Sequence, residues 1–290
     1  MLDLKFIREH PELVKDGIRK KNADDCVDEI LTLDKQRRDT LQKVETLKNT
    51  RNVMSDEIGK LKKEGKDSTQ SIMRMDEVKR QIRELDDELK IVEKKLNELM
   101  LTIPNIPHPS VPVGDTPADN VVISEWGEIP QIDFIPKPHW EIAHRLDIID
   151  FERGVKITGA GFPLFKGKGA KLQRALVNFF LDEASKRGYR EIQPPLMING
   201  ESAMGTGQLP DKEDLMYVIT KDELYLVPTA EVPVTNIHRN EILAEQDLPI
   251  KYSSYTPCFR REAGSYGKDV RGLNRVHQFD KVELVKFVHP

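Results

Sequence analysis

The residues best suited to catalysis lie near the C-terminal end of the sequence, between Tyr252 and Glu283. The pattern there predicts a strand, a long loop with several glycines, and a second strand. Because side chains alternate between the faces of a strand, Arg260 and Glu262 share one face of the first strand. Phe279 and Glu283 share one face of the second strand. In an antiparallel pair these two faces can coincide.

The predicted hairpin presents a guanidinium, two carboxylates and an aromatic ring, with loop cations at Lys268, Arg271 and Arg275. This combination suits a triphosphate with a stackable base, because cations bind phosphates and an aromatic ring stacks on the base. The alternative is a sheet surface with structural salt bridges, which is the commoner role of charge-rich hairpins. Phe279 argues against that alternative, since an aromatic core residue needs apolar neighbours. The residues alone predict an anion-binding hairpin.

Three Gly-x-Gly runs, at 159–161, 167–169 and 205–207, do not extend this prediction. None has the third glycine or the strand–loop–helix context of a dinucleotide-binding fold. No Gly-Lys pair in the sequence has the glycine spacing of a Walker phosphate loop. A nucleotide would therefore bind neither through a dinucleotide-binding fold nor through a Walker phosphate loop.

The segments upstream supply the elements that must position this hairpin. Residues 168–188 predict a helix that is capped by Gly188 and carries one apolar stripe. That stripe consists of Leu172, Ala175, Leu176, Phe179 and Ala184. A short strand is predicted over 189–192, and the prolines that follow it force an extended exit. Residues 224–228 predict a second strand, with a helix beginning near Thr229.

The first 100 residues differ from the rest in composition. They hold 23 Lys and Arg, 23 Asp and Glu, and only four Gly and Pro, whereas the remaining 190 residues hold 31 Gly and Pro. Apolar residues recur in steps of three and four over 75–99, and a weaker heptad seam runs over 30–61. So many charges and so few helix breakers predict two long helices here, and a globular domain in the remainder.

The polar segment 62–68 between the two seams predicts a tight connection. Gly65 suits a helix C-terminus, and Asp67 or Ser68 suits the next N-cap. Two helices joined by so short a loop pack antiparallel, which gives an arm of roughly 50 Å. A shorter amphipathic helix is predicted over 10–20, and three prolines over 104–109 end the second arm helix.

Two interpretations of the arm remain open on the pattern alone. It could be a dimerisation coiled coil or a plain spacer, or it could project to grip an elongated partner. Lysines near its tip could meet phosphates, although most such clusters are merely solvated. These lysines are Lys60, Lys62, Lys63 and Lys66.

Composition excludes several classes of protein. The formal net charge of -4 excludes a merely cationic, electrostatically adhesive protein. Two distant cysteines, Cys26 and Cys258, exclude a disulfide-stapled scaffold and a four-cysteine zinc site, and favour a reducing cytoplasm. No apolar stretch approaches the ~20 residues that a membrane-spanning helix needs, so no membrane partner is expected.

The hairpin segment resembles motif 2 of the seryl-tRNA synthetase family, class II aminoacyl-tRNA synthetases of the bacterial type. The resemblance rests on the runs at 259–264 and 271–283. Residues 188–195 look like motif 1, with Pro195 in the place of the motif's proline at the dimer interface. Further likenesses are 205–210 to the family's loop over the site, 228–233 to its serine-binding segment, and the N-terminal hairpin to its tRNA-binding arm.

The resemblance implies an α+β fold with a long antiparallel coiled-coil arm and a class II domain whose antiparallel β-sheet is flanked by helices. The implied parts are a tRNA-binding arm over 1–103, a linker over 104–128 and a catalytic domain over 129–290. A ligase of this family is a cytoplasmic homodimer that uses ATP and Mg²⁺ to attach L-serine to tRNA(Ser), with tRNA(Sec) as a further candidate.

The resemblance also implies site residues. L-serine would be bound by Thr229, Ala230, Glu231, Arg260 and Glu283. ATP would be bound by Arg260, Arg261, Glu262, Arg275, Val276 and Phe279. In these roles Glu231 faces the serine ammonium, and Arg260 binds the α-phosphate. Glu262 accepts from the adenine amino group, Phe279 stacks on the ring, Val276 contacts the nucleotide through its backbone, and Arg275 holds the terminal phosphates. No protein ligand for the metal is implied.

The sequence departs from the family at its end. No Gly-x-Gly-x-x-Arg of motif 3 occurs in it, and the family continues beyond this point. We therefore expect either a piece of a longer enzyme, inactive alone, or a natural short form. A non-catalytic tRNA-binding or regulatory relative is the alternative to the ligase, although Arg260, Glu262, Phe279 and Glu283 would be unnecessary in one.

Overall fold

The computed structural model describes residues 2–211, 214–262 and 271–289. These residues form two compact units, Met1–Glu128 and Ile129–Pro290, each of which has its own core. Lys268, one of the predicted loop cations, lies outside the described residues. None of the helices in the described ranges combines the length and the apolar character that crossing a membrane requires.

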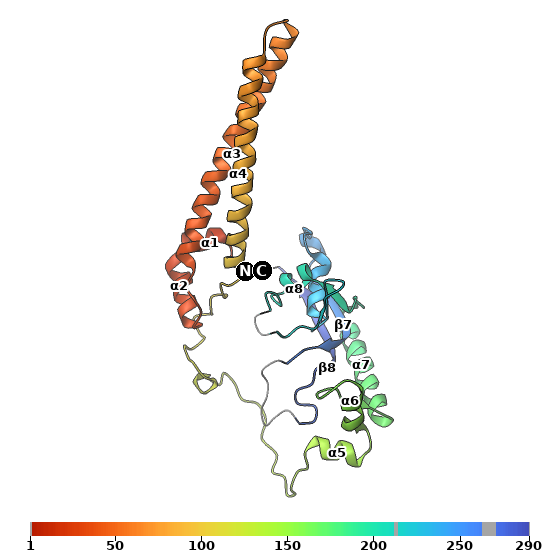
Figure 1. Cartoon of the computed structure of the whole chain (residues 1–290). Helices are drawn as coiled ribbons and strands as arrows, with labels where there is room; N and C mark the ends of the chain where they lie inside the picture. The colour runs from red at the N-terminus through yellow and green to blue at the C-terminus, as the bar shows by residue number, and fades with distance from the viewer. Residues whose placement is uncertain (1, 212–213, 263–270, 290) are drawn as a thin grey trace. The chain divides into compact units, whose positions relative to one another are not determined.

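The N-terminal unit is helical. Two short helices, α1 (Leu4–Glu9) and α2 (Pro11–Lys20), precede two long ones, α3 (Val27–Lys63) and α4 (Thr69–Met100). The two long helices run side by side in opposite directions as a projecting hairpin, with the short helices at its base (Figure 1). The base is closed by a cluster of apolar side chains from all four helices. This cluster comprises Ile7, Val14, Ile18, Val27, Ile30, Leu96, Met100 and Ile103.

The heptad pattern predicts the contact surface of the hairpin. Every seam position over 75–99 is buried or half-buried, and so are the seam positions of α3. The polar interruptions of the first seam are accommodated individually. Arg37 pairs across the hairpin with Glu93 at 2.9 Å, and Thr40 is buried. A long guanidinium can occupy a seam position because its stem packs while its head reaches a carboxylate on the partner helix.

The connection at the tip uses the predicted residues. Gly65 has φ +68°, a conformation that costs a glycine little, directly after α3 ends. Ser68 occupies the N-cap position of α4, but its side chain makes no capping bond. Asp67 supplies the acceptor instead, since its Oδ1 accepts from the backbone N–H of Thr69 at 2.9 Å and from its hydroxyl at 2.6 Å. These bonds lower the pKa of Asp67.

A buried carboxylate ties the base of the arm together, and the pattern of the sequence did not predict it. The side chain of Asp34 on α3 is 2% exposed and accepts from Arg8 of α1 at 3.1 Å and from Arg38 at 3.0 Å. A buried charge is stable only with such partners. Asp34 therefore sets where α1 packs on α3.

The C-terminal unit begins after a largely exposed connecting segment whose one helical turn is η1 (Pro117–Asp119) among the described residues. Its first elements are α5 (His139–Arg145), β1 (Ile149–Asp150), α6 (Phe151–Ile157), β2 (Leu164–Phe165) and α7 (Lys168–Lys186). Next come β3 (Arg190–Glu191), β4 (Met197–Asn199), α8 (Gly200–Gly205), β5 (Val218–Ile219), β6 (Leu224–Leu226) and α9 (Glu231–Thr235). Last come two 3-10 turns, η2 (Asn236–His238) and η3 (Glu245–Asp247), and the strands β7 (Ile250–Phe259) and β8 (Gln278–Phe287).

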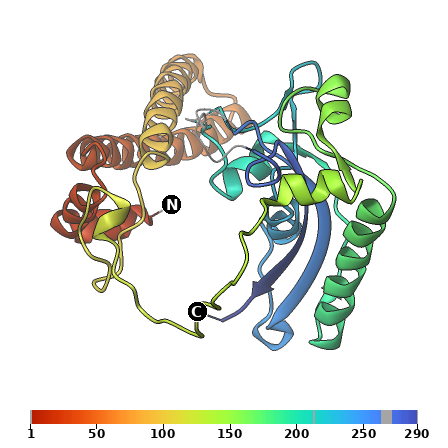
Figure 2. The ribbon, with the colours of Figure 1, turned by 90° about the horizontal axis from the view of Figure 1, so that it is seen from below.

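The strands β7 and β8 dominate this unit. They pair antiparallel over ten residues each, while β3 joins the other edge of β7 in parallel. A second sheet, in the order β4-β6-β5, is antiparallel. Helix α7 runs alongside the long strands (Figure 2). The fold is therefore α+β, with mainly antiparallel sheets flanked by helices, and the parallel pairing of β3 is the one departure from the expected antiparallel sheet among the described strands.

The apolar stripe of α7 is largely uncovered within this unit. Gly188 caps the helix with φ +78°, but only Gly169 and Ala184 of the helix are buried. The large side chains on α7 are about half exposed: Leu172 57%, Leu176 46%, Phe179 56% and Phe180 51%. The pattern predicted which side chains share a stripe, and it did not predict that this stripe remains open to solvent.

Candidate active site

The register of β7 and β8 builds one polar surface. Phe279, Lys281 and Glu283 alternate along β8 and therefore point to the same face. Their partners across the ladder are Cys258, Thr256 and Ser254, all of which are buried. Phe279 and Glu283 thus share a face. Lys281 lies between them, and the same alternation would have identified it from the sequence.

Arg260 and Glu262 differ from the prediction in one respect: they follow β7 instead of belonging to it. The strand ends at Phe259, and Glu262 has φ +48°, outside the extended region. The backbone N–H of Arg260 still donates to the carbonyl of His277 at 2.9 Å. The hairpin therefore continues by one bond beyond the strand, and the chain turns away before Glu262.

Arg260 nevertheless meets the side chain with which it was predicted to act. Its guanidinium carbon lies 5.2 Å from the centre of the Phe279 ring, and its Nε donates to the carbonyl of Pro228 at 3.3 Å. A cation over an aromatic face is attracted by the ring quadrupole. The guanidinium is thus held in place at the end of the strand pair, beside the segment that leads into α9.

A hydrogen-bonded cluster joins that segment to β8. The hydroxyl of Thr229 donates to Oε2 of Glu283 at 2.9 Å and accepts from Nζ of Lys281 at 2.8 Å. Lys281 also forms an ion pair with Glu283. The backbone N–H of Glu231 donates to the same hydroxyl at 3.2 Å. Thr229 is 4% exposed, whereas the side chains of Lys281 and Glu283 are 30% and 24% exposed. The cluster is therefore a partly buried polar site that a small polar ligand can reach.

The two residues that follow Thr229 differ in exposure. Ala230 is completely buried and packs against Val234 and Tyr252, so it presents no surface to a ligand. Glu231 is exposed and begins α9. Of the predicted serine-binding residues, the structure therefore brings Thr229 and Glu283 into contact and leaves the Glu231 carboxylate open to solvent.

The remaining predicted ATP-binding residues lie around the end of the hairpin. Arg275 pairs with Glu262 at 3.1 Å, and Arg261 pairs with Asp214 at 2.9 Å. The Arg261 guanidinium also lies 5.9 Å from the centre of a tyrosine ring, that of Tyr217. Part of the expected salt-bridge character of this hairpin is therefore present, alongside the cluster of Thr229.

His277 has a structural role that sequence reasoning missed. Its Nδ1 lies 2.9 Å from the carbonyl oxygen of Arg260, and its backbone N–H donates to the carbonyl of Gly161 at 2.9 Å. Its ring stacks on Phe162 with centroids 5.3 Å apart. A Cβ atom at Gly161, where φ is +80°, would collide with the His277 ring. The Gly-x-Gly run at 159–161 therefore packs against His277, directly before the strand that carries Phe279.

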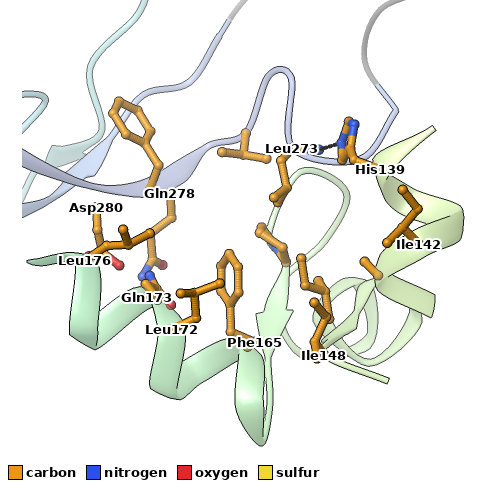
Figure 3. A pocket seen from close by; sticks show the side chains of 16 residues that line it. His139, Ile142, Ile148, Phe165, Leu172, Gln173, Leu176, Leu273, Gln278 and Asp280 are labelled. Carbon is orange, nitrogen blue, oxygen red and sulfur yellow. Dashed lines mark hydrogen bonds between the residues drawn. The ribbon is translucent and has the colours of Figure 1, made fainter. Parts of the chain in front are cut away.

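A cavity of about 490 Å³ lies beside the start of β8, where it is lined by Gln278 and Asp280, which point to the face opposite Lys281 and Glu283. Its walls are mostly apolar and come from α5, β2, α7 and the end of the hairpin; Figure 3 labels Ile142, Phe165 and Leu172 among them. Val276, which is 9% exposed, and Phe279 also line it. On its rim, the backbone N–H of Leu273 donates to Nε2 of His139 at 2.7 Å (Figure 3). Two predicted nucleotide-binding residues therefore border a hollow in the surface.

The pKa values of two further groups on the strand pair are raised. Burial raises the pKa of Tyr255 to about 12, with a further contribution from the bond its hydroxyl donates to Asp280 at 2.8 Å. Burial also raises the pKa of the Cys258 thiol. Both side chains are therefore uncharged at neutral pH.

The other predicted binding residues lie at the surface. Pro195 is exposed, as are Lys60, Lys62 and Lys63 near the tip of the arm. Lys66 is also exposed, and it pairs with Glu64 at 2.7 Å. Within the described ranges, His, Cys, Asp and Glu side chains do not gather in threes or more in a way that could hold a metal ion.

Comparisons with known proteins agree with this architecture. Residues 1–107 match the model of the seryl-tRNA synthetase N-terminal domain, and residues 217–290 match that of the tRNA synthetase class II core domain (G, H, P, S and T). The chain is 54% identical to a serine–tRNA ligase of Salinibacter ruber over 294 residues and 53% identical to one of Trichlorobacter lovleyi over 293 residues. These alignments cover 100% of this chain and 69% of each relative.

Solved structures give the same result. The seryl-tRNA synthetase of Pyrococcus horikoshii, complexed with ATP, matches with a TM-score of 0.86 and 38% identity over 98% of this chain and 69% of its own. The cytoplasmic serine–tRNA ligase of Naegleria fowleri, in complex with AMP, matches with a TM-score of 0.79 and 29% identity over 98% of this chain and 66% of its own. With more than half of its residues identical to those of a curated relative, this chain belongs to the serine–tRNA ligase family of aminoacyl-tRNA synthetases.

Proposed function

We propose that this chain activates L-serine with ATP to give seryl-adenylate and transfers the seryl group to the 3′ end of tRNA(Ser). The observation that carries the proposal is the contact of Thr229 with Lys281 and Glu283, beside Arg260. Such a partly buried set of donors and acceptors fits a small hydroxylated amino acid. An analogue without the hydroxyl would leave the remaining oxygen of Glu283 without a hydrogen bond from the substrate.

Serine binding is proposed for Thr229, Ala230, Glu231, Arg260 and Glu283. The exposed carboxylate of Glu231 is placed to attract the substrate ammonium, and Glu283 accepts from the substrate hydroxyl. Ala230, which is completely buried, contributes by fixing the backbone between its two neighbours. Thr229 supports Glu283 through the bond that its hydroxyl donates.

ATP binding is proposed for Arg260, Arg261, Glu262, Arg275, Val276 and Phe279. Phe279 supplies an aromatic face for the adenine, and Val276 contacts the nucleotide through its backbone. Arg275 and Glu262 are ion-paired, so their proposed roles at the terminal phosphates and the adenine amino group require this pair to separate. The free-energy cost of separating the ion pair is offset because phosphate oxygens replace the Glu262 carboxylate as the partner of Arg275.

The proposed reaction needs no covalent intermediate with the protein. A carboxylate oxygen of serine attacks the α-phosphorus of ATP, and pyrophosphate leaves with the bonding electron pair. Arg260 supplies a fixed positive charge where negative charge develops. A ribose hydroxyl of the tRNA then attacks the seryl carbonyl, and AMP leaves. We propose that Mg²⁺ enters bound to the phosphates of ATP, where it neutralises charge on the leaving group.

The first prediction tests substrate specificity. In the full-length protein that carries this sequence, exchange of labelled pyrophosphate into ATP is expected to depend strictly on serine, because Glu283, held by Thr229, is placed to accept from a substrate hydroxyl. Alanine and threonine serve as controls, since one lacks the hydroxyl and the other adds a methyl group. Equal exchange with alanine or threonine would contradict the assignment. Binding of tRNA with no exchange would favour the non-catalytic relative.

The arm is proposed to bind the tRNA. This assigns 1–103 to tRNA binding, 104–128 to a linker and 129–290 to catalysis. Lys60, Lys62, Lys63 and Lys66 are exposed at the tip of an antiparallel coiled coil, where phosphates could approach them without desolvating a core. Recognition of tRNA(Sec) by the same arm is part of the proposal, as is a location in the cytoplasm, where these substrates occur.

We also propose a homodimer that covers the apolar face of α7. This face consists of Leu172, Leu176, Phe179 and Phe180, each about half exposed. Four large apolar side chains on one helix form a patch of the kind that marks a protein interface. The chain runs from α7 through β3 to the exposed Pro195, which the proposal places at the edge of the same interface.

The second prediction follows from that face. Replacing Phe179 by aspartate is expected to convert the dimer to a monomer, because a carboxylate would be buried without a partner. Sedimentation velocity measures the mass of the particle. The control is Ile242→Asp, since Ile242 is fully exposed outside this face and its replacement should leave the dimer intact. A dimer that persists in Phe179→Asp would place the interface elsewhere.

A further inference from the structure

The ring of contacts around Thr229 assigns a function to Lys281 that the proposed roles leave open. Lys281 comes from the middle of β8, and its side chain is 30% exposed. Its ammonium contacts both Thr229 and Glu283, which are proposed to bind the substrate. Lys281 therefore does not itself contact the substrate in the proposed site, but it contacts the two residues that are proposed to recognise the substrate.

The hydrogen-bonding capacity of the Thr229 hydroxyl is fully used. A hydroxyl has one donor and two acceptor positions. Here the oxygen accepts from Nζ of Lys281 at 2.8 Å and from the backbone N–H of Glu231 at 3.2 Å, and the proton goes to Glu283 at 2.9 Å. Because an ammonium can only donate, Lys281 forces the hydroxyl proton toward the carboxylate. Thr229 has no capacity left for a substrate hydroxyl, so it acts as a support.

The same ammonium determines how Glu283 can act. The bond from Thr229 reaches Oε2, and so does the ion pair with Lys281. Oε1 is then the oxygen through which this carboxylate can accept from a substrate. Without Lys281, the Thr229 hydroxyl would be free to rotate, and the carboxylate would stand without its counter-charge in a site that also contains Glu231.

We propose that Lys281 is a positioning residue that orients the Thr229 hydroxyl and Glu283, and thereby sets the preference for serine over its analogue without the hydroxyl, alanine. The inference rests on the proposed function of this site. It concerns selectivity, because Lys281 touches no reacting atom in the proposed reaction. Its removal should therefore affect the amino acid much more than ATP.

The third prediction compares Lys281→Met with a matched control in pyrophosphate exchange. Lys281→Met is expected to raise the KM for serine by about 10- to 100-fold, the loss typical of a hydrogen bond to a charged group, while the KM for ATP stays within about 2-fold. The ratio of kcat/KM for serine to that for alanine should fall by a similar factor. The control is Lys286→Met, a lysine on the same strand but on its other face, 5.7 Å from the centre of the Tyr189 ring. Lys286→Met should retain the normal KM for serine and the normal KM for ATP.

A double-mutant cycle with Glu283→Gln separates positioning from a general loss of structure. If Lys281 acts through Glu283, its removal should change serine selectivity less than about 3-fold when Glu283 is already glutamine. Lys281→Arg should recover part of the selectivity, because a guanidinium can donate to both partners, and it serves as the deciding variant if Lys281→Met does not fold.

The outcomes separate this inference from the proposed function. No serine-dependent exchange by the unmodified protein would remove the proposed function, and the inference with it. Serine-dependent exchange that is unchanged in selectivity in Lys281→Met would overturn the inference alone. Additive effects of Lys281→Met and Glu283→Gln would also overturn it, because they would show that the lysine acts independently of the carboxylate.

Discussion

Replacing Arg260 by alanine is expected to lower the kcat of serine-dependent pyrophosphate exchange by about 10²-fold or more. The guanidinium is held between the Phe279 ring, 5.2 Å from its centre, and the carbonyl of Pro228 at 3.3 Å. A charge fixed in this way needs no reorganisation when negative charge develops on the α-phosphate. The loss should therefore appear in kcat as well as in kcat/KM, which steady-state kinetics separates.

Two further variants sharpen this test. Arg260→Lys keeps the charge and loses the planar fork, so an activity between those of the unmodified protein and Arg260→Ala is expected. Arg153→Ala is the matched control, because Arg153 belongs to α6, pairs with Asp150 at 2.6 Å and is 72% exposed. Its activity should remain unchanged. An Arg260→Ala protein with normal kcat and only a raised KM for serine would restrict Arg260 to substrate binding.

The predictions that proved reliable are those that depend on local periodicity. Every position that the heptad steps over 75–99 identify is buried or half-buried, because helical geometry alone decides which side chains share a stripe. Alternation along β8 likewise places Phe279 and Glu283 on one face. Lys281 obeys the same alternation, so it could have been found from the sequence with no further information.

Other features depend on partners that no local pattern contains. Asp34 is buried because Arg8, 26 residues earlier in the chain, packs beside it. The role of His277 depends on Gly161, more than a hundred residues away in the sequence. The stripe of α7 is a case of a different kind, since periodicity identifies an apolar face but not what covers it. Contacts between residues that are far apart in the chain could not be predicted from local patterns, whereas the residue types suited to the site could.

The strand β7 is shorter than its sequence pattern predicts. Alternation predicts that the strand continues through Arg260 and Glu262, but the strand ends at Phe259. The positive φ of Glu262 turns the chain there, and its carboxylate pairs with Arg275. The contact of Arg260 with Phe279 therefore forms even though Arg260 lies beyond the last paired residue of β7.

The largest effect expected on tRNA charging comes from shortening the arm. Residues 42–88 can be replaced by a short glycine-rich loop, because Arg37 and Glu93 already bridge the two helices closer to the base. The apolar cluster at the base and the buried Asp34 remain intact in this design. Transfer of serine to tRNA(Ser) is expected to fall below detection, since the tip lysines are removed with the segment.

Serine-dependent pyrophosphate exchange by the same shortened protein is expected to remain within about 2-fold of normal, because removal of a contact that serves only a second substrate leaves the first step unaffected. The matched control replaces Lys60, Lys62, Lys63 and Lys66 by glutamine in the complete arm, which removes the charge and keeps the helices. If charging falls in both proteins, the tip cations bind the tRNA. If exchange falls together with charging in the shortened protein, the arm supports the catalytic unit, and the proposed division of labour between the two units is wrong.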